Sequence, residues 1–275
     1  MNRDEVLLRR TLVLYEFYWA YEYKYHPGSL QKTINITASF YLHFMQHLLL
    51  LHGAIGGKDQ LQPLAQLLSN SFIIHTLSFS GHGGNNIPDE PFSIELFAND
   101  VIQYLDQQNI EQSNIFGYSM GGYVGMYLAK HYPEKIIKVI TLATKVYWDE
   151  AIAAKEIKMM DADILEQKVP AFAAQLAKRH APNNWKTILM KAAEMLENLG
   201  RNNTLKTEDY TSVTTPCLLL LGDRDKMVTL DETAAVYKQL PNAQLGLLPN
   251  TPHPLEQVDN TLLSFMIYRF LKQQQ

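Results

Sequence analysis

Short runs of apolar residues alternate along the chain with longer stretches in which apolar residues recur every three to four positions. The short runs predict buried strands, and the longer stretches predict helices that cover them. The predicted strands span residues 47–51, 71–79, 114–117, 136–142, 217–221 and 244–248, and the predicted helices span residues 58–68, 94–105, 120–131, 230–240 and 255–271. This alternation indicates an α/β fold with a mostly parallel central sheet flanked by helices.

The alternation stops between residues 145 and 210. This segment is rich in Ala, Lys, Glu and Met and contains no convincing strand, and the strand–helix order resumes only at residue 217. We therefore predict a helical insertion at residues 145–210 between two strands of one sheet. Residues 1–144 and 211–275 are expected to form the core domain around that sheet.

The first 46 residues allow two interpretations. Apolar residues alternate with mostly polar ones between Ile34 and Phe44, which is the pattern of a half-buried strand. The sequence His-Pro-Gly-Ser at residues 26–29 favours a turn, so residues 13–44 could form a hairpin. A helix over residues 4–18 fits the same sequence, and both interpretations stay open.

Composition and charge exclude several classes of partner. The chain has 275 residues, of which 47% are hydrophobic and 19% are charged, as in ordinary globular proteins. A formal charge of −4 offers no basic field, so we expect neither nucleic acid nor a membrane as a partner. No apolar stretch approaches the ~18 residues that span a bilayer, and no signal-peptide cleavage site is evident. A cytoplasmic protein is therefore expected.

The sequence gives no indication of a cofactor or a metal. The single cysteine, Cys217, lies in a predicted strand and reads as a buried structural residue. No cysteine pair is available for zinc. The pair His43 and His47 lacks the glutamate of a zinc-protease motif, and the glycines at residues 81–84 lack the Gly-Lys-Ser/Thr of a phosphate loop.

The strongest chemical signal is the sequence Gly-Tyr-Ser-Met-Gly-Gly at residues 117–122. It lies between a predicted strand and a predicted helix, which is the context of a nucleophile on a sharp turn. Such a turn lifts the hydroxyl of Ser119 clear of the sheet, and glycines two residues away avoid a clash with the neighbouring elements. A glycine-rich turn without chemistry is the competing interpretation.

A serine hydroxyl needs a base to act as a nucleophile, and in this order of elements the acid and then the histidine follow the serine. His253 lies in the loop after the last predicted strand, flanked by two prolines, and is the candidate base. The acid should follow the strand at residues 217–221, where Asp223 and Asp225 are available. Asp225 lies further along the loop and is our choice to orient the imidazole, whereas Asp223 is better placed to stabilise the turn.

An oxyanion would need two backbone N–H donors. Met120 begins the helix after the serine, and Ala54 lies in the glycine-containing loop after the first predicted strand. We predict that these two N–H groups form the oxyanion hole. His52, at the start of the same loop, is expected to brace it by hydrogen bonding.

These motifs together resemble the α/β-hydrolase superfamily. The His-Gly turn at residue 52, the Gly-His-Gly sequence at residues 81–83, the serine turn, the Gly-Asp-Arg-Asp sequence at residues 222–225 and the late His253 follow its order over residues 47–270. The resemblance implies that the insertion at residues 145–210 is a cap that covers the active site. Residues implied to line the pocket are Tyr118, Tyr147, Trp148, Phe172, Trp185, Met159, Met160, Met190 and Met195.

Carboxylic ester hydrolysis of a small-molecule acyl substrate through an acyl-enzyme is the function that we expect. A synthase of the menaquinone-pathway type resembles the chain in its serine turn, but such enzymes carry an arginine where this chain has Tyr123. Lys178, Arg179 or Arg201 could substitute for it. The same fold could also support hydrolysis of a carbon–carbon bond, or ligand binding without catalysis.

Overall fold

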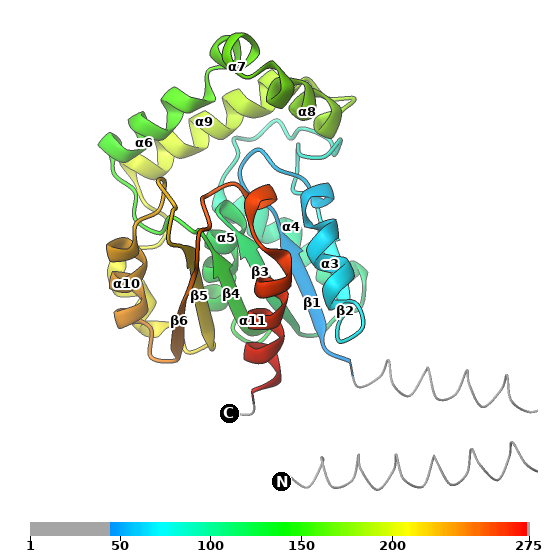
Figure 1. Cartoon of the computed structure of the whole chain (residues 1–275), viewed down its shortest axis with the longest axis vertical. Coiled ribbons are helices and arrows are strands. Elements are labelled where there is room, and N and C mark those ends of the chain that lie inside the picture. The colour runs from blue at the N-terminus through cyan, green and yellow to red at the C-terminus, as the bar shows by residue number, and fades with distance from the viewer. Residues whose placement is uncertain (1–44, 274–275) are drawn as a thin grey trace, which may run out of the picture. The chain divides into compact units, whose positions relative to one another are not determined.

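Six parallel strands form the central sheet of the chain, whose computed structural model describes residues 45–273. In chain order they are β1 (His47–Leu51), β2 (Ile73–Leu77), β3 (Ser113–Tyr118), β4 (Ile136–Leu142), β5 (Cys217–Gly222) and β6 (Ala243–Leu248). They lie in the order β2-β1-β3-β4-β5-β6, and every neighbouring pair is parallel. Their carboxyl ends therefore meet at one edge of the sheet (Figure 1). The predicted α/β class with a parallel sheet is confirmed.

Helices cover both faces of this sheet (Figure 1). On one face lie α3 (Gln62–Leu68) and α11 (Asn260–Lys272), and on the other lie α4 (Ile94–Gln107), α5 (Met120–His131) and α10 (Leu230–Gln239). Successive side chains of a strand point to opposite faces. Leu49 and Leu51 of β1 accordingly lie in the core beneath α4 and α5, and Leu48 and Leu50 lie in the core beneath α3 and α11. Burial on both faces explains why β1 is an almost continuous apolar run, whereas the edge strands β2 and β6 are only partly buried.

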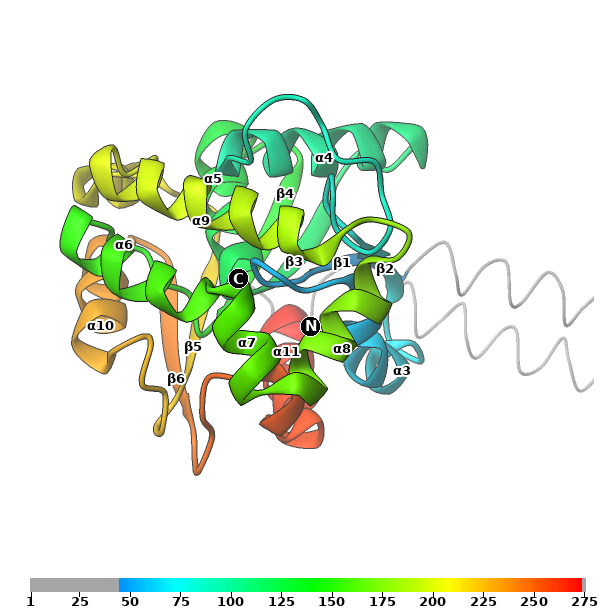
Figure 2. The ribbon, with the colours of Figure 1, turned by 90° about the horizontal axis from the view of Figure 1, so that it is seen from above.

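The predicted helical insertion lies between β4 and β5. It consists of α6 (Glu150–Ile157), α7 (Ala162–Lys168), α8 (Pro170–His180) and α9 (Trp185–Arg201), with 3₁₀ turns at Lys158–Met160 and Thr207–Ser212. These helices lie over the carboxyl edge of the sheet, and α6 and α9 run side by side (Figure 1, Figure 2). The insertion therefore covers the edge at which a parallel sheet presents its loops.

Several element boundaries differ from the prediction for local reasons. The predicted helix at residues 58–68 is a 3₁₀ turn, Lys58–Leu61, followed by α3, whose start is fixed by Pro63 in its first turn. The last helix begins at Asn260 rather than residue 255, because the Asp259 carboxylate accepts hydrogen bonds from the first backbone N–H groups of α11. The strand predicted at residues 71–79 is limited to Ile73–Leu77. The hairpin predicted for residues 13–44 and the alternative helix at residues 4–18 lie outside the residues that the structure describes.

Within residues 45–273, no helix combines the length and the apolar character needed to cross a bilayer. The same residues contain no cluster of three or more His, Cys, Asp or Glu side chains arranged to hold a metal ion.

Candidate active site

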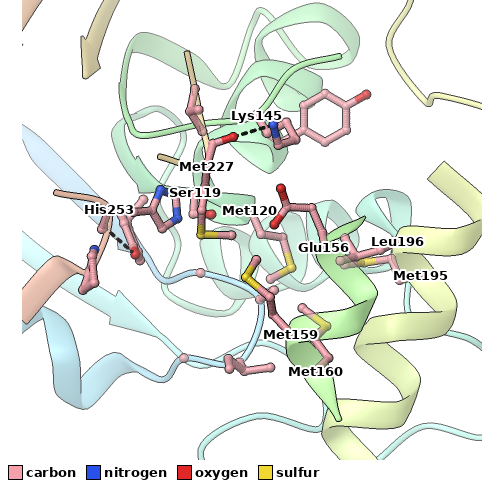
Figure 3. A pocket seen from close by; sticks show the side chains of 18 of the residues that line it. Ser119, Met120, Lys145, Glu156, Met159, Met160, Met195, Leu196, Met227 and His253 are labelled. Atoms are coloured by element: carbon pink, nitrogen blue, oxygen red, sulfur yellow. Dashed lines mark hydrogen bonds between the residues drawn. The ribbon is translucent and has the colours of Figure 1, made fainter. Parts of the chain in front are cut away.

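Four loops at the carboxyl edge bring the predicted site residues together. Ala54 follows β1, Ser119 follows β3, Asp225 follows β5 and His253 follows β6. Ala54, Ser119, Met120 and His253 line one pocket beneath the insertion, and Figure 3 shows the His253 imidazole beside Ser119. Residues that are far apart in the sequence meet here because parallel strands end at a common edge.

Ser119 occupies a strained turn between β3 and α5, with φ 51° and ψ −117°. A positive φ in a residue other than glycine costs about 1–3 kcal/mol, so surrounding contacts must hold it. The Ser119 N–H donates to the Leu142 carbonyl at 2.8 Å, and the Thr144 hydroxyl donates to the Ser119 carbonyl at 3.1 Å. Both contacts come from β4 or the residues just after it, and they fix the backbone on which the hydroxyl is presented.

The two glycines around Ser119 are required by close approach. A Cβ on Gly117 would lie 2.3 Å from the carbonyl carbon of Gly121. A Cβ on Gly121 would lie 2.6 Å from the carbonyl oxygen of Leu51 and 2.7 Å from that of His52. These obstacles are backbone atoms that cannot turn aside as a side chain could. The Gly-x-Ser-x-Gly pattern is therefore accounted for by this geometry.

Asp225 orients the His253 ring. The His253 Nδ1 lies 2.8 Å from Asp225 Oδ2, so Nδ1 carries the proton and Nε2 is free to act as an acceptor. The other carboxylate oxygen, Oδ1, accepts hydrogen bonds from the N–H groups of Met227 at 2.8 Å and Val228 at 2.9 Å. Burial by itself raises the pKa of the Asp225 carboxyl, but the hydrogen bonds from His253 and from these N–H groups outweigh it and hold the pKa below its ordinary value.

Asp223, the second candidate acid, has a different place. Its Oδ1 accepts a hydrogen bond from the Thr251 N–H at 3.1 Å, which joins the loop after β5 to the loop that carries His253. That loop is also held by Tyr118, whose hydroxyl donates to the His253 carbonyl at 2.9 Å. The two contacts fix the backbone of His253, while Asp225 fixes its side chain.

Three histidines brace the loop that carries Ala54. His52, His82 and His180 are all buried, and they contact the carbonyl oxygens of three successive residues, 53–55. The contacts are His52 Nδ1 to Gly53 O at 2.7 Å, His82 Nε2 to Ala54 O at 2.5 Å and His180 Nε2 to Ile55 O at 3.2 Å. In a trans peptide the N–H points away from the C=O of the same unit. By fixing the Gly53 carbonyl, His52 therefore also fixes the direction of the Ala54 N–H.

The protonation of these histidines follows from their partners. His52 Nε2 accepts from the Phe79 N–H at 3.1 Å, and His180 Nδ1 accepts from the Gly83 N–H at 3.1 Å, so each ring donates only to its loop carbonyl. Burial and the neighbouring His82 lower the pKa of His52 well below its ordinary value and lower that of His180 to about 4. Burial also lowers the pKa of His82. The His52 and His180 rings are therefore neutral near pH 7, whereas both ring nitrogens of His82 face carbonyl oxygens, those of Ser80 at 3.0 Å and of Ala54 at 2.5 Å. The interpretation of His52 as a bracing residue agrees with this geometry, whereas the sequence analysis assigned no role to His82 or His180.

The pocket has a volume of about 330 Å³, which suits a small molecule. Its wall contains most of the residues that the resemblance implied, namely Tyr118, Trp148, Met159, Met160, Phe172 and Met195. Tyr147 and Trp185 do not line it. The Tyr147 side chain is about half exposed (51%), and Trp185 packs among Ala173, Leu176 and Leu189 in a small core of the insertion. Met190 is exposed as well (54%). Helical periodicity does not reveal which face of an insertion helix points to the pocket.

Glu156 is a pocket residue that the sequence analysis missed. It lies on α6, is 3% exposed and lines the pocket beside Met120 (Figure 3). A possible signal was its position three residues after Ala153, the other buried residue of α6. A single glutamate in an exposed-looking helix does not stand out without the tertiary structure.

Comparison with known proteins identifies the family. A family model described as alpha/beta hydrolase fold matches residues 46–184. The chain is 26% identical to 3-oxoadipate enol-lactonase 2 of Acinetobacter baylyi, over 68% of this chain and 74% of that protein. Among solved structures, an enol-lactonase from Burkholderia xenovorans has a TM-score of 0.68 at 18% identity, covering 83% of this chain and 92% of that one. The structure of MenH from S. aureus has a TM-score of 0.65 at 22% identity, covering 82% and 93%. The chain belongs to the α/β-hydrolase fold family, and its relatives include hydrolases.

Proposed function

We propose that the protein is a serine hydrolase that cleaves carboxylic esters of small molecules through an acyl-enzyme. The observation that carries this proposal is the combination of Ser119 on a strained turn with the hydrogen-bonded pair His253–Asp225, at one pocket beneath the insertion. The insertion would act as a cap that selects the substrate. The hydrolases among the relatives support the reaction class.

The reaction would proceed in two steps. In the first, Ser119 Oγ attacks the ester carbonyl carbon while His253 Nε2 takes the hydroxyl proton, and the imidazolium then passes that proton to the departing alkoxide. In the second, His253 takes a proton from the water that attacks the acyl carbonyl, and the imidazolium returns this proton to Ser119 Oγ as the acyl C–O bond breaks and the acid leaves. The Asp225 carboxylate stabilises the imidazolium in both steps. The N–H groups of Ala54 and Met120 would stabilise the oxyanion, and the N–H of Met120 has no partner within α5 because it is the first residue of that helix.

The charges around the pocket disfavour a synthase of the menaquinone-pathway type, whose substrate is anionic. Tyr123 stands in the place of the arginine. Its hydroxyl donates a hydrogen bond to Asn203 Oδ1 and accepts one from the Leu205 N–H. Of the three basic residues that could substitute, Arg179 pairs with Asp59 at 3.0 Å, Arg201 pairs with Glu197 and Lys178 is exposed. An anion would therefore compete with existing partners.

A fluorophosphonate probe tests the proposal, because it labels only a serine that is activated as a nucleophile. We expect labelling of the purified protein, none in Ser119→Ala and strongly reduced labelling in His253→Ala. Turnover of p-nitrophenyl esters should fall by at least about 10³-fold in both variants. Esters of increasing chain length then measure the depth of the pocket.

Two exposed residues provide matched controls. Ser69→Ala and His131→Ala remove the same side chains from helix ends far from the pocket and should label like the wild type. A folded wild-type protein that does not label would refute the serine-hydrolase proposal and favour ligand binding without catalysis.

A further inference from the structure

The Glu156 carboxyl group lacks a partner at a place where burial makes this costly. The residue is 3% exposed, and its Oε2 has no hydrogen-bond partner. Its side chain is directed from α6 into the pocket, toward the side on which Met120 and Ser119 lie (Figure 3). Buried polar atoms are normally paired, so an unpaired one in a pocket points to a group that a ligand supplies.

The other charged side chains of the pocket are already paired. Lys145 Nζ donates to the Met227 carbonyl at 2.6 Å and lies 3.5 Å from Glu232. Arg179 binds Asp59 at 3.0 Å and lies 3.8 Å from Glu256. No ion pair between described residues includes Glu156. Glu156 is therefore the one acidic side chain of this pocket without an ion-pair or hydrogen-bond partner for its buried Oε2, within the part of the chain that the structure describes.

The surroundings of Glu156 are apolar and adaptable. Five methionines line the pocket, namely Met120, Met159, Met160, Met195 and Met227. Methionine side chains fit the methylene groups of an alkyl chain and adjust to its shape. A ligand that matches this site combines an apolar chain with one hydrogen-bond donor, and a positive charge on that donor would strengthen the bond to a carboxylate.

We propose that the substrate carries a protonated amine on an apolar arm, and that this ammonium group binds the Glu156 carboxylate while the ester lies at Ser119. The inference rests on the proposed function for the reacting end of the substrate. It adds the chemical class of the remote end, an aminoalkyl group. Glu156 is a specificity-determining residue in this arrangement, because it contacts the substrate away from the bond that breaks.

Binding of three six-carbon ligands to the wild-type protein tests this directly by isothermal titration calorimetry. Hexylammonium, 1-hexanol and hexanoate share the alkyl chain and differ in the charge of the head group. We expect hexylammonium to bind about tenfold more tightly than 1-hexanol, and hexanoate to bind most weakly. Glu156→Gln keeps the shape and removes the charge, so the preference for hexylammonium over 1-hexanol should fall by about tenfold.

Glu150→Gln is the matched control, because Glu150 lies on the same helix but is exposed. This variant should keep the wild-type preference. Equal or tighter binding of hexanoate by the wild type, or an ammonium preference that survives in Glu156→Gln, would overturn the inference. Fluorophosphonate labelling of the same preparation separates the two proposals. A labelled protein without ammonium preference retains the hydrolase proposal alone, and an unlabelled protein with a preference that depends on Glu156 retains the amine site alone.

Discussion

The stability of the folded protein should decrease at acidic pH, because His180 makes both of its hydrogen bonds only as a neutral imidazole. Protonation of both ring nitrogens would remove its ability to accept a hydrogen bond. His180 accepts from the Gly83 N–H and donates to the Ile55 carbonyl, so it joins α8 to two loops of the core. The side chain is 1% exposed. Burial and His82 lower its pKa to about 4, Arg179 acts in the same direction, and the Ile55 carbonyl and Asp59 oppose them.

The size of the effect follows from proton linkage. An unfolded histidine has a pKa of about 6.5, so between pH 6.5 and pH 4 the unfolded chain binds a proton at this position that the folded chain does not. The free energy of unfolding therefore decreases as the pH falls through this window. For a folded pKa of about 4, His180 alone should account for a loss of about 2 kcal/mol between pH 7 and pH 5.

The substitution His180→Gln isolates this contribution. A glutamine amide can still donate to the Ile55 carbonyl but does not titrate. Urea unfolding at pH 7 and at pH 5 gives the loss of stability in each protein, and the histidines that do not interact with residue 180 contribute equally to both losses. We expect the wild type to lose about 2 kcal/mol more than the variant. Equal losses would refute the assignment of a neutral, doubly bonded His180.

Three further substitutions test other parts of the structure. Asp225→Asn should lower kcat on p-nitrophenyl esters by about 10²–10⁴-fold with KM little changed, because the imidazole loses its orienting carboxylate. An unchanged kcat would exclude Asp225 from the site. Lys138→Met should lower the free energy of unfolding, measured by chemical denaturation, by about 1–3 kcal/mol. The reason is that Lys138 Nζ donates to the carbonyls of Phe270, Leu271 and Gln273 at the end of α11. Gly121→Ala should lower the melting temperature far more than Gly125→Ala, because a Cβ added at Gly125 would lie no closer than 3.2 Å to side-chain atoms. Similar shifts in the two variants would contradict the close approach at Gly121.

The sheet and the candidate triad could be predicted because their signals are local. The four inner strands, β1, β3, β4 and β5, are almost entirely buried and rich in apolar residues, whereas the edge strands β2 and β6 are only partly buried. Ser119 lies in a motif that spans only a few residues. His253 and Asp225 were found from chain order, since in a parallel sheet the loop after each strand reaches the same edge. The choice of Asp225 over Asp223 agrees with the observed hydrogen bond to His253. The roles of these residues in catalysis stay a prediction.

The pocket wall could not be predicted in the same way. Side chains such as Tyr147 and Glu156 lie on or near helices of the insertion, where the sequence gives a periodicity but not the neighbour that each face meets. The large aromatic Tyr147 is about half exposed (51%), and the charged Glu156 is buried (3%), which is the reverse of what residue type alone suggests. Such inversions depend on how α6 lies over the core, and that contact involves residues far apart in the sequence.

The insertion contacts the loop that carries Ala54 as well as lining the pocket. His180 belongs to α8, yet it binds the carbonyl of Ile55, the residue that follows the proposed oxyanion donor Ala54. Glu232 of α10 in turn accepts the N–H groups of Val146 and Tyr147, which fixes the start of the insertion against the core. The insertion is thus tied to the core at both its entry and its third helix. Changes in its position would therefore move the loop that carries Ala54 together with the pocket wall, so under the proposed function substrate choice and rate are expected to be coupled.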